Sequence, residues 1–179
     1  MKQWILKISL VGLIAICGGC GYTLKANLPE NLKRVHVAPV KNNVDLSSAI
    51  SQKSPFRVYR PGLEVELTND VINRFIFDGQ LKVTSVEKAD AVVEVTLMDY
   101  QRDGLRYNQA DEVQEYRLSV SMDVVVTQTS AQKVLWHDRV TGDTTFFLGG
   151  PRAISEDQAA AKAVEDAARR IVERTLEYW

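Results

Sequence analysis

Two histidines and two cysteines are the side chains best suited to metal binding or covalent chemistry in this chain. His36 and His137 both fall inside predicted strands, and neither has another histidine or a carboxylate at the spacing typical of a metal site. The sequence lacks a Gly-x-Ser-x-Gly nucleophile elbow. The glycines at 149–150 lack the lysine and the strand-to-helix context of a phosphate-binding loop. We therefore predict no enzyme activity, no metal site and no cofactor.

Cys20 follows a segment with the pattern of an export signal. Lys2 and Lys7 open the chain without an acidic residue, residues 8–16 are almost wholly apolar, and small residues lead up to the cysteine. This apolar stretch is far shorter than the roughly 20 residues that a membrane-spanning helix needs. It therefore predicts a signal peptide over residues 1–19 that is removed.

The pair Gly19-Cys20 is similar to a bacterial lipobox, in which a small residue precedes a cysteine that is acylated and becomes the mature N-terminus. Cys17 stands where a lipobox usually has leucine. The alternative is an ordinary signal peptide that leaves Cys20 as a free thiol. Two or three acyl chains would anchor the protein stably, and Gly21, in place of aspartate, favours the outer membrane. We predict lipidation at Cys20 and a periplasm-facing, lipid-anchored protein of the outer membrane.

Composition limits what the rest of the chain can do. Cleavage before Cys20 would leave 179 − 19 = 160 residues, enough for one domain with a core. The mature chain would carry 22 − 2 = 20 basic and 23 acidic residues, a formal charge near −3, which argues against nucleic-acid binding. No cysteine follows Cys20, so disulfides and thiolate metal sites are excluded there. We expect a lipidated tether over 20–32 and a single α+β domain over 33–179.

Hydrophobic periodicity predicts the secondary structure. Strict alternation predicts five strands, at 34–40, 81–86, 89–100, 115–126 and 133–140. A period of 3.6 residues predicts two helices, one at 63–77 and one of five or six turns that starts at Ser155. The order is strand, helix, four strands, helix. It predicts an α+β fold with one mixed, largely antiparallel sheet and two helices packed on one face.

The segments between these elements are rich in polar residues and glycine. We predict a long loop over 41–59, a polar loop over 102–111, a turn at 129–132 and a second turn at Gly142-Asp143. The segment 146–151 is read as a short apolar stretch that ends in glycines and proline.

Core positions follow from the same periodicity. On the first helix they form a stripe of Leu67, Val71 and Phe75, flanked by Thr68, Ile72 and Ile76. On the last strand we place Val134, Trp136 and Val140 on the core side, with Trp136 as a major anchor.

The last helix carries its own start signal. Ser155 and Gln158 have the spacing of a capping box. Glu165 with Arg169, and Asp166 with Arg170, are four apart in the favourable order. The inward face is predicted to consist of Ala160, Val164, Ala167, Ala168, Ile171 and Thr175.

Four groups of residues, taken in order, resemble a known family. They are Gly19-Cys20-Gly21-Tyr22-Thr23-Leu24, then Leu28-Pro29 with residues 32–40, then residues 60–70 beginning Arg60-Pro61-Gly62-Leu63, and Lys88-Ala89-Asp90 with residues 91–95. Their order and spacing resemble the lipopolysaccharide-assembly lipoproteins of the LptE type, over nearly the whole mature chain. One departure is the stretch from Val44 to Tyr59, which is longer than the family pattern.

The resemblance implies a function without catalysis. Members of this family are held in the outer membrane by their lipid, plug the lumen of the large β-barrel LptD, assist its folding and help to pass lipopolysaccharide to the outer leaflet. The implied partners are therefore an LptD-type barrel, lipopolysaccharide and the membrane. The alternative is an accessory lipoprotein subunit of another envelope secretion or transport complex.

Lipopolysaccharide is anionic, and arginine and lysine bind phosphates through charge-assisted hydrogen bonds. Because the mature chain is slightly acidic, a local basic patch must supply these contacts. Lys133, at the turn between two long strands, is the first candidate, and Arg102, Arg106 and Arg139 are the others. For each, the alternative is a solvated surface cation. We predict that Lys133→Glu weakens lipopolysaccharide binding without unfolding the domain.

Overall fold

The computed structural model of the protein describes residues 32–44 and 61–177. The predictions of a signal peptide at 1–19, of lipidation at Cys20, of nearly all of the tether and of most of the loop 41–59 lie outside the described residues. The described elements are, in order, β1 (Arg34–Val37), β2 (Lys41–Asn42), α3 (Leu63–Asp78), β3 (Lys82–Val83), a 3-10 turn (Val86–Lys88), β4 (Ala91–Tyr107), β5 (Val113–Gln128), β6 (Lys133–Phe147) and α4 (Glu156–Glu177).

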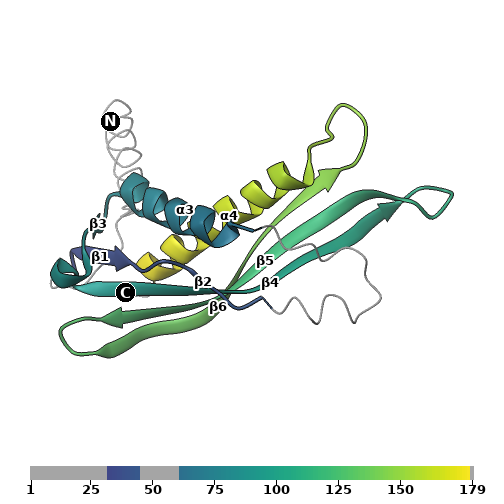
Figure 1. The fold of residues 1–179 in the computed structure, drawn as a ribbon. Helices are drawn as coiled ribbons and strands as arrows, with labels where there is room; N and C mark the ends of the chain where they lie inside the picture. The colour runs from purple at the N-terminus through teal and green to yellow at the C-terminus, as the bar shows by residue number, and fades with distance from the viewer. Residues whose placement is uncertain (1–31, 45–60, 178–179) are drawn as a thin grey trace, which may run out of the picture.

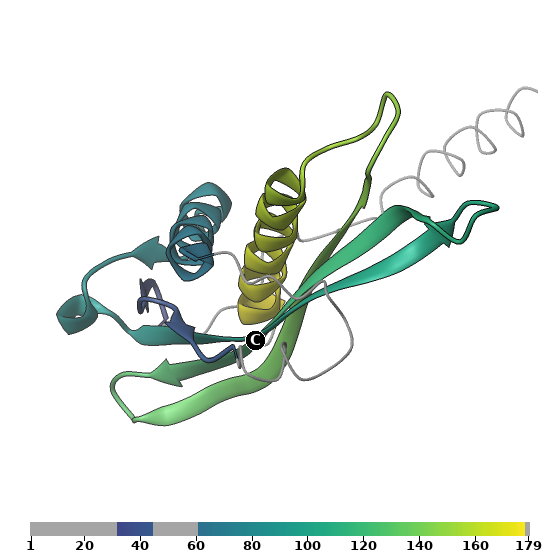
Figure 2. The same cartoon turned by 45° about the vertical axis from the view of Figure 1, so that its right-hand side comes forward.

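One mixed sheet carries both helices on the same face (Figure 1). Its strand order is β3-β1-β4-β5-β6, and β2 pairs with β4. β1 is parallel to β3 and β4, whereas β4, β5 and β6 form an antiparallel meander. The predicted α+β class is thereby confirmed. Figure 2 shows the β4–β5 hairpin projecting beyond the two helices.

Asp90, immediately before β4, ties β1 into the sheet. Its carboxylate accepts hydrogen bonds from the backbone N–H groups of Lys33 and Arg34, at 3.1 and 2.9 Å. It also pairs with the Arg34 guanidinium at 2.7 Å. The side-chain hydrogen bond from Arg34, together with these two amides, lowers the pKa of Asp90 to about 2.

β5 has one buried face and one wetted face, as its alternation predicts. On the opposite face Ser121 and Thr141 share a hydrogen bond of 3.0 Å between β5 and β6. The predicted inward positions of β5 are all buried, and they are Tyr116, Leu118, Val120, Met122, Val124 and Val126. The inward positions of β4 are buried as well, and they are Ala91, Val93, Val95 and Leu97.

The polar segment after residue 100 belongs to β4 as far as Tyr107, so the prediction of a loop over 102–111 is wrong for 102–107 and confirmed for 108–111. β4 continues to Tyr107. Register shifts at 97–99 and at 104–106 break the apolar alternation while backbone pairing with β5 continues. The hydrophobic pattern stops before the hydrogen-bond ladder does, because this part of the sheet extends past the helices that bury the rest (Figure 2).

The prediction that Val134 lies on the core side is wrong. A register shift in the β5–β6 ladder leaves Leu135 as the extra residue of a bulge. Leu135 and Trp136 are consequently buried, while Val134 is 51% exposed. Trp136 and Val140 belong to the core, as predicted.

α3 buries a narrower stripe than its sequence suggests. Ile76, predicted on the apolar face, is 62% exposed, and Phe77 is 80% exposed. Gly79, with φ of 76°, ends the helix and donates its N–H to the Phe75 carbonyl. The other predicted core positions of the stripe are buried, and they are Leu67, Val71 and Phe75.

α4 begins at the predicted capping box. The Gln158 N–H donates to the Ser155 hydroxyl at 3.2 Å, and the Ser155 N–H donates to the Gln158 side chain at 3.1 Å. All six predicted inward residues are buried, and they are Ala160, Val164, Ala167, Ala168, Ile171 and Thr175.

The charged pairs on α4 follow the predicted pattern in part. Asp166 pairs with Arg170 at 2.7 Å, as predicted. Arg169 instead pairs with Asp166 at 2.5 Å and with Glu173 at 2.6 Å, and not with Glu165.

Gly142 lies in the middle of β6, so the prediction of a turn at Gly142-Asp143 is wrong. A Cβ at position 142 would lie 2.5 Å from the backbone nitrogen of Ala167 and closer still to the carbonyl oxygen of Ala163. The strand continues without a reversal to Phe147. The glycine therefore serves close helix-on-strand packing rather than chain reversal.

The outer edge of β6 is partly occupied by groups from α4. The Asp143 N–H donates to the Asp166 carboxylate at 3.1 Å. Arg170 pairs with the Asp143 side chain at 3.1 Å, and Arg174 pairs with Asp138 at 3.0 Å. Such charged side chains discourage another strand from adding to the edge.

Candidate functional site

Beyond α4 the three long strands continue into a projecting end, which we call the tip (residues 104–116 and 146–153; Figure 1). There Tyr107 pairs with Val113, and Glu115 pairs with Phe147. The ladder therefore brings the β4–β5 turn beside the end of β6.

Two arginines flank one aromatic ring at the tip. The guanidinium carbon of Arg106 lies 5.8 Å from the centroid of the Phe147 ring, and that of Arg152 lies 5.1 Å from it. Arg106 also pairs with Glu115 at 3.4 Å, and its side chain is 64% exposed. Cation–π contact fixes a guanidinium over a ring without using all five of its N–H donors. Both arginines can therefore still bind an anion.

Apolar side chains of the same segments are left exposed. Leu105 is 43% exposed, Tyr107 55% and Leu148 57%. A hollow of about 520 Å³ lies between the β4–β5 turn and the end of β6, and Val113, Phe147 and Leu148 line it together with Glu112. Exposed apolar groups and positive charge at one end of a sheet are the features that an amphiphile with an anionic head would need.

A buried polar contact joins the tip to the start of α4. Arg102 is only 15% exposed and pairs with Glu156, which also accepts a hydrogen bond from the Tyr100 hydroxyl at 3.3 Å. The Arg102 guanidinium lies 4.6 Å from the centroid of Tyr116, and the Tyr116 ring stacks on Phe146 at 5.7 Å. Arg102 thus connects the start of α4 to the Tyr116 ring at the base of the tip.

The four cations predicted to bind lipopolysaccharide do not form one patch. Arg106 is exposed at the tip, whereas Arg102 is largely buried in its ion pair with Glu156. Lys133 opposes Gln128 at the other end of β5, and 16 strand residues separate the two ends by roughly 50 Å. Arg139 is exposed near the middle of β6, opposite Asp123.

Sequence reasoning missed Phe147 and Arg152. The segment 146–151 reads as a short apolar stretch before glycines and proline, and Arg152 follows it without a recognisable pattern. Arg106 and Arg152 meet on one ring only because β4, β5 and β6 pair in register. One local signal could have pointed to this site: the apolar pair Phe147-Leu148 stands directly before glycines and proline, where large apolar side chains tend to be left exposed.

The histidines take part in ordinary contacts. The His36 Nδ1 lies 3.0 Å from the Thr84 carbonyl oxygen, and the His137 Nε2 lies 3.0 Å from the Asp123 carboxylate. Within residues 32–44 and 61–177, no group of three or more histidine, cysteine, aspartate or glutamate side chains is placed to hold a metal ion. The helices in these ranges include none that is long and apolar enough to cross a membrane.

Comparison with known proteins gives one family and a set of related folds. A family model described as LptE, lipopolysaccharide-assembly, matches residues 32–176 and confirms the family resemblance. No curated protein matches the chain.

Two solved structures are similar in fold. The hypothetical protein CT253 from Chlamydia trachomatis superposes with a TM-score of 0.55 at 14% identity, over 82% of this chain and 97% of that one. Protein XCC0632 from Xanthomonas campestris gives a TM-score of 0.53 at 14% identity, over 81% and 82%. At such identities the likeness is one of fold alone.

Proposed function

The chain belongs to the LptE family of lipopolysaccharide-assembly proteins, and from this membership we propose the finer role. The protein is an outer-membrane lipoprotein, anchored by acyl chains on Cys20 and facing the periplasm. It occupies the lumen of an LptD-type β-barrel, assists the folding of that barrel and helps to pass lipopolysaccharide to the outer leaflet. It does this by binding and positioning, without catalysis.

The exterior of the domain suits a polar barrel lumen. The sheet face away from the helices carries Ser119, Ser121, Asp123 and Arg139, all exposed or half-buried. The lumen of a large barrel is polar and wet, so a plug needs a hydrophilic exterior over a well-packed core.

The tip is the surface that suits lipopolysaccharide best, and this is the observation that carries the proposal. Arg106 from β4 and Arg152 from the segment after β6 can present their guanidinium groups to phosphate oxygens. Leu105, Tyr107 and Leu148 offer exposed apolar surface at the same end of the sheet. A phosphorylated amphiphile uses both kinds of contact at once.

The position of the tip also agrees with a lipid anchor. The described domain begins at Leu32, next to β1, and β1 pairs with the first residues of β4. The tip lies at the far end of β4, so it extends away from the side on which the anchored segment enters. An anchored protein could therefore hold its N-terminal end at the membrane while the tip contacts a second ligand.

A pull-down of the mature lipoprotein from outer membranes in detergent tests the partner. We expect a large β-barrel to copurify in a one-to-one ratio. Recovery of a periplasmic or inner-membrane protein in its place would favour an accessory subunit of another envelope complex and reject the barrel assignment.

Binding of purified lipopolysaccharide to the detergent-solubilised lipoprotein tests the ligand. The double variant Arg106→Glu, Arg152→Glu should bind at least about tenfold more weakly, because two phosphate contacts become repulsive. Lys88→Glu makes the same kind of charge change at an exposed position before β4, at the end of the sheet opposite the tip, and should bind normally. Lys133→Glu tests the location of the site. If lipopolysaccharide binding is lost in this variant alone, the site lies at the opposite end of β5.

A further inference from the structure

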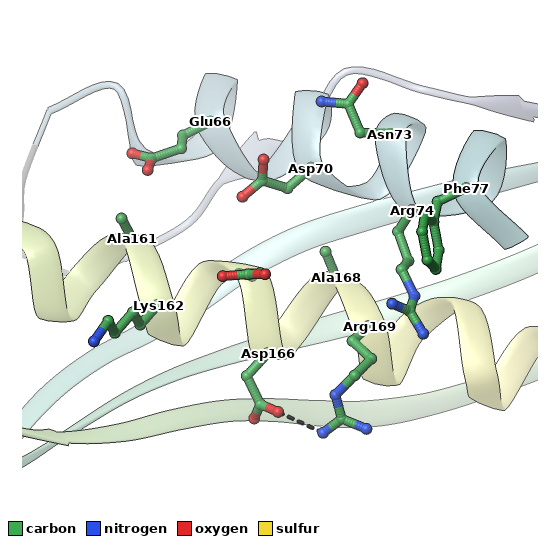
Figure 3. A pocket seen from close by; sticks show the side chains of 11 residues that line it. Glu66, Asp70, Asn73, Arg74, Phe77, Ala161, Lys162, Asp166, Ala168 and Arg169 are labelled. Carbon is green, nitrogen blue, oxygen red and sulfur yellow. Dashed lines mark hydrogen bonds and ion pairs between the residues drawn. The ribbon is translucent and has the colours of Figure 1, made fainter.

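A groove of about 680 Å³ lies between α3 and α4, away from the tip. Figure 3 shows Glu66, Asp70 and Phe77 along α3 and the small side chains Ala161 and Ala168 along α4. Because the alanine side chains are small, they leave space between the two helices. The two ends of this groove differ in chemistry.

One end carries an exposed aromatic side chain. Phe77 is 80% exposed, and the Arg74 guanidinium lies 5.4 Å from its ring centroid. Arg74 is itself paired with Glu173 of α4 at 3.5 Å. A large apolar ring that is fixed at the mouth of a groove, yet left uncovered, is typical of an interaction surface.

The other end is acidic. Asp70 faces Glu165 across the groove, with Glu66 one turn earlier on α3. Burial first, and then the negative charges of Glu66 and Glu165, raise the pKa of Asp70. Lys162 also lines this end, but its ammonium points away from α3 (Figure 3). A cation brought close to Asp70 would relieve this repulsion.

The arginines at the aromatic end do not supply that cation. Arg169 is committed to Asp166 and Glu173, and Figure 3 shows Asp166 and Arg169 directed toward each other. The groove therefore combines two groups. The Asp70 carboxylate would be stabilised by a nearby positive charge, and the Phe77 ring would be removed from water by an apolar side chain.

We propose that this groove docks a polypeptide segment of the barrel partner, which places a lysine or arginine against Asp70 and a bulky apolar side chain against Phe77. The inference rests on the proposed function, because that function supplies the partner. Asp70 and Phe77 are seven residues apart on one helix, a span of about 10 Å. The docked segment therefore carries its two side chains about two helical turns, or about three extended residues, apart.

The test measures formation of the complex between the full mature lipoprotein and its barrel. Asp70→Lys and Phe77→Ser should each reduce the affinity at least about tenfold. Asn69→Lys and Ile76→Ser are matched controls, because each changes the adjacent exposed residue of α3 outside the groove. Asp70→Asn should weaken the complex less and should not lower the thermal unfolding temperature, because it removes the repulsion from Glu66 and Glu165. This variant separates loss of docking from loss of folding.

A photo-crosslinking residue at Asn73, in the middle of the groove, identifies the occupant. We expect a crosslink to a barrel peptide that contains a lysine or arginine and a bulky apolar residue. Crosslinks confined to this chain, or to lipopolysaccharide, would overturn the inference.

The two proposals can fail separately. A stable barrel complex in which Asp70→Lys and Phe77→Ser behave like their controls rejects the docking groove and leaves the proposed function intact. If the wild-type protein forms no barrel complex, both proposals are rejected together.

Discussion

Strands β4, β5 and β6 pass from a region covered by α4 into a tip that α4 does not cover, and their side chains change accordingly. Under α4 the contacts are apolar and close, and at Gly142 even a methyl group would overlap the helix backbone. At the tip the aromatic rings of Tyr116 and Phe147 are covered by arginines, and apolar side chains such as Leu105 remain exposed.

The difference separates folding from ligand binding within one sheet. The covered region removes apolar surface from water, which is the main source of stability in a small domain. The tip keeps apolar surface in water next to positive charge, which stabilises the fold little but provides a surface for a ligand. Substitutions in the two regions should therefore have opposite consequences for stability and for binding.

The largest effect should come from Gly142→Val. Its side chain would occupy space that Ala163 and Ala167 of α4 already fill, so α4 must move off the sheet. We expect a loss of about 3 kcal/mol or more of unfolding free energy, at the upper end for overpacked cores. Urea unfolding measures it. Gly149→Ala at the tip is the control and should unfold like wild type, because an added Cβ there would have nothing but its chain neighbours within 4 Å.

A pair of leucines compares the two regions directly. Leu118 is fully buried in β5, and Leu118→Ala should lower the unfolding free energy by about 2 to 5 kcal/mol. Leu105 at the tip is 43% exposed, and Leu105→Ala should lower it by about 0.5 kcal/mol at most. Thermal unfolding of both variants provides the measurement. Equal losses would mean that the tip is part of the core after all.

The contact between the two regions should show an intermediate effect. Glu156→Ala leaves the nearly buried Arg102 guanidinium without its carboxylate, which should cost about 1 to 3 kcal/mol. Because Arg102 supports Tyr116 and Phe146, lipopolysaccharide binding should weaken as well. Unfolding and binding assays on one preparation test this. Binding that is unchanged despite lower stability would show that the tip keeps its shape without this support.

The smallest effect should depend on pH and arise at the end of the sheet away from the tip. The pKa of Asp90 is lowered to about 2 in the folded protein, against about 3.9 for an unperturbed aspartate. A lowered folded-state pKa gives stability that is present above pH 4 and is lost as the pH falls toward 2. Urea unfolding of wild type and Asp90→Asn at pH 7, 4 and 2 should show a difference that disappears at the lowest pH. A difference that persists there would assign the role of Asp90 to packing.

Local patterns predicted much of the fold and little of the candidate site. The capping box at Ser155 and Gln158 is confirmed, because its two hydrogen bonds join residues only three apart. The alternation of β5 is confirmed because one of its faces is fully covered. At the end of β4 the sequence predicts a loop where the strand continues, because its polar residues carry no alternation where no helix covers the sheet.

The sequence by itself determined the elements whose signals lie within a few residues of one another: the α3 stripe, the α4 cap and the buried face of β5. Only the tertiary structure decided that Gly142 sits beneath α4, that a bulge turns Val134 outward, and that Arg106 and Arg152 share the ring of Phe147. The physical reason is the range of the interactions. Helix caps and strand alternation are local, whereas close helix-on-strand packing and a site built from three strands depend on residues that are distant in the chain.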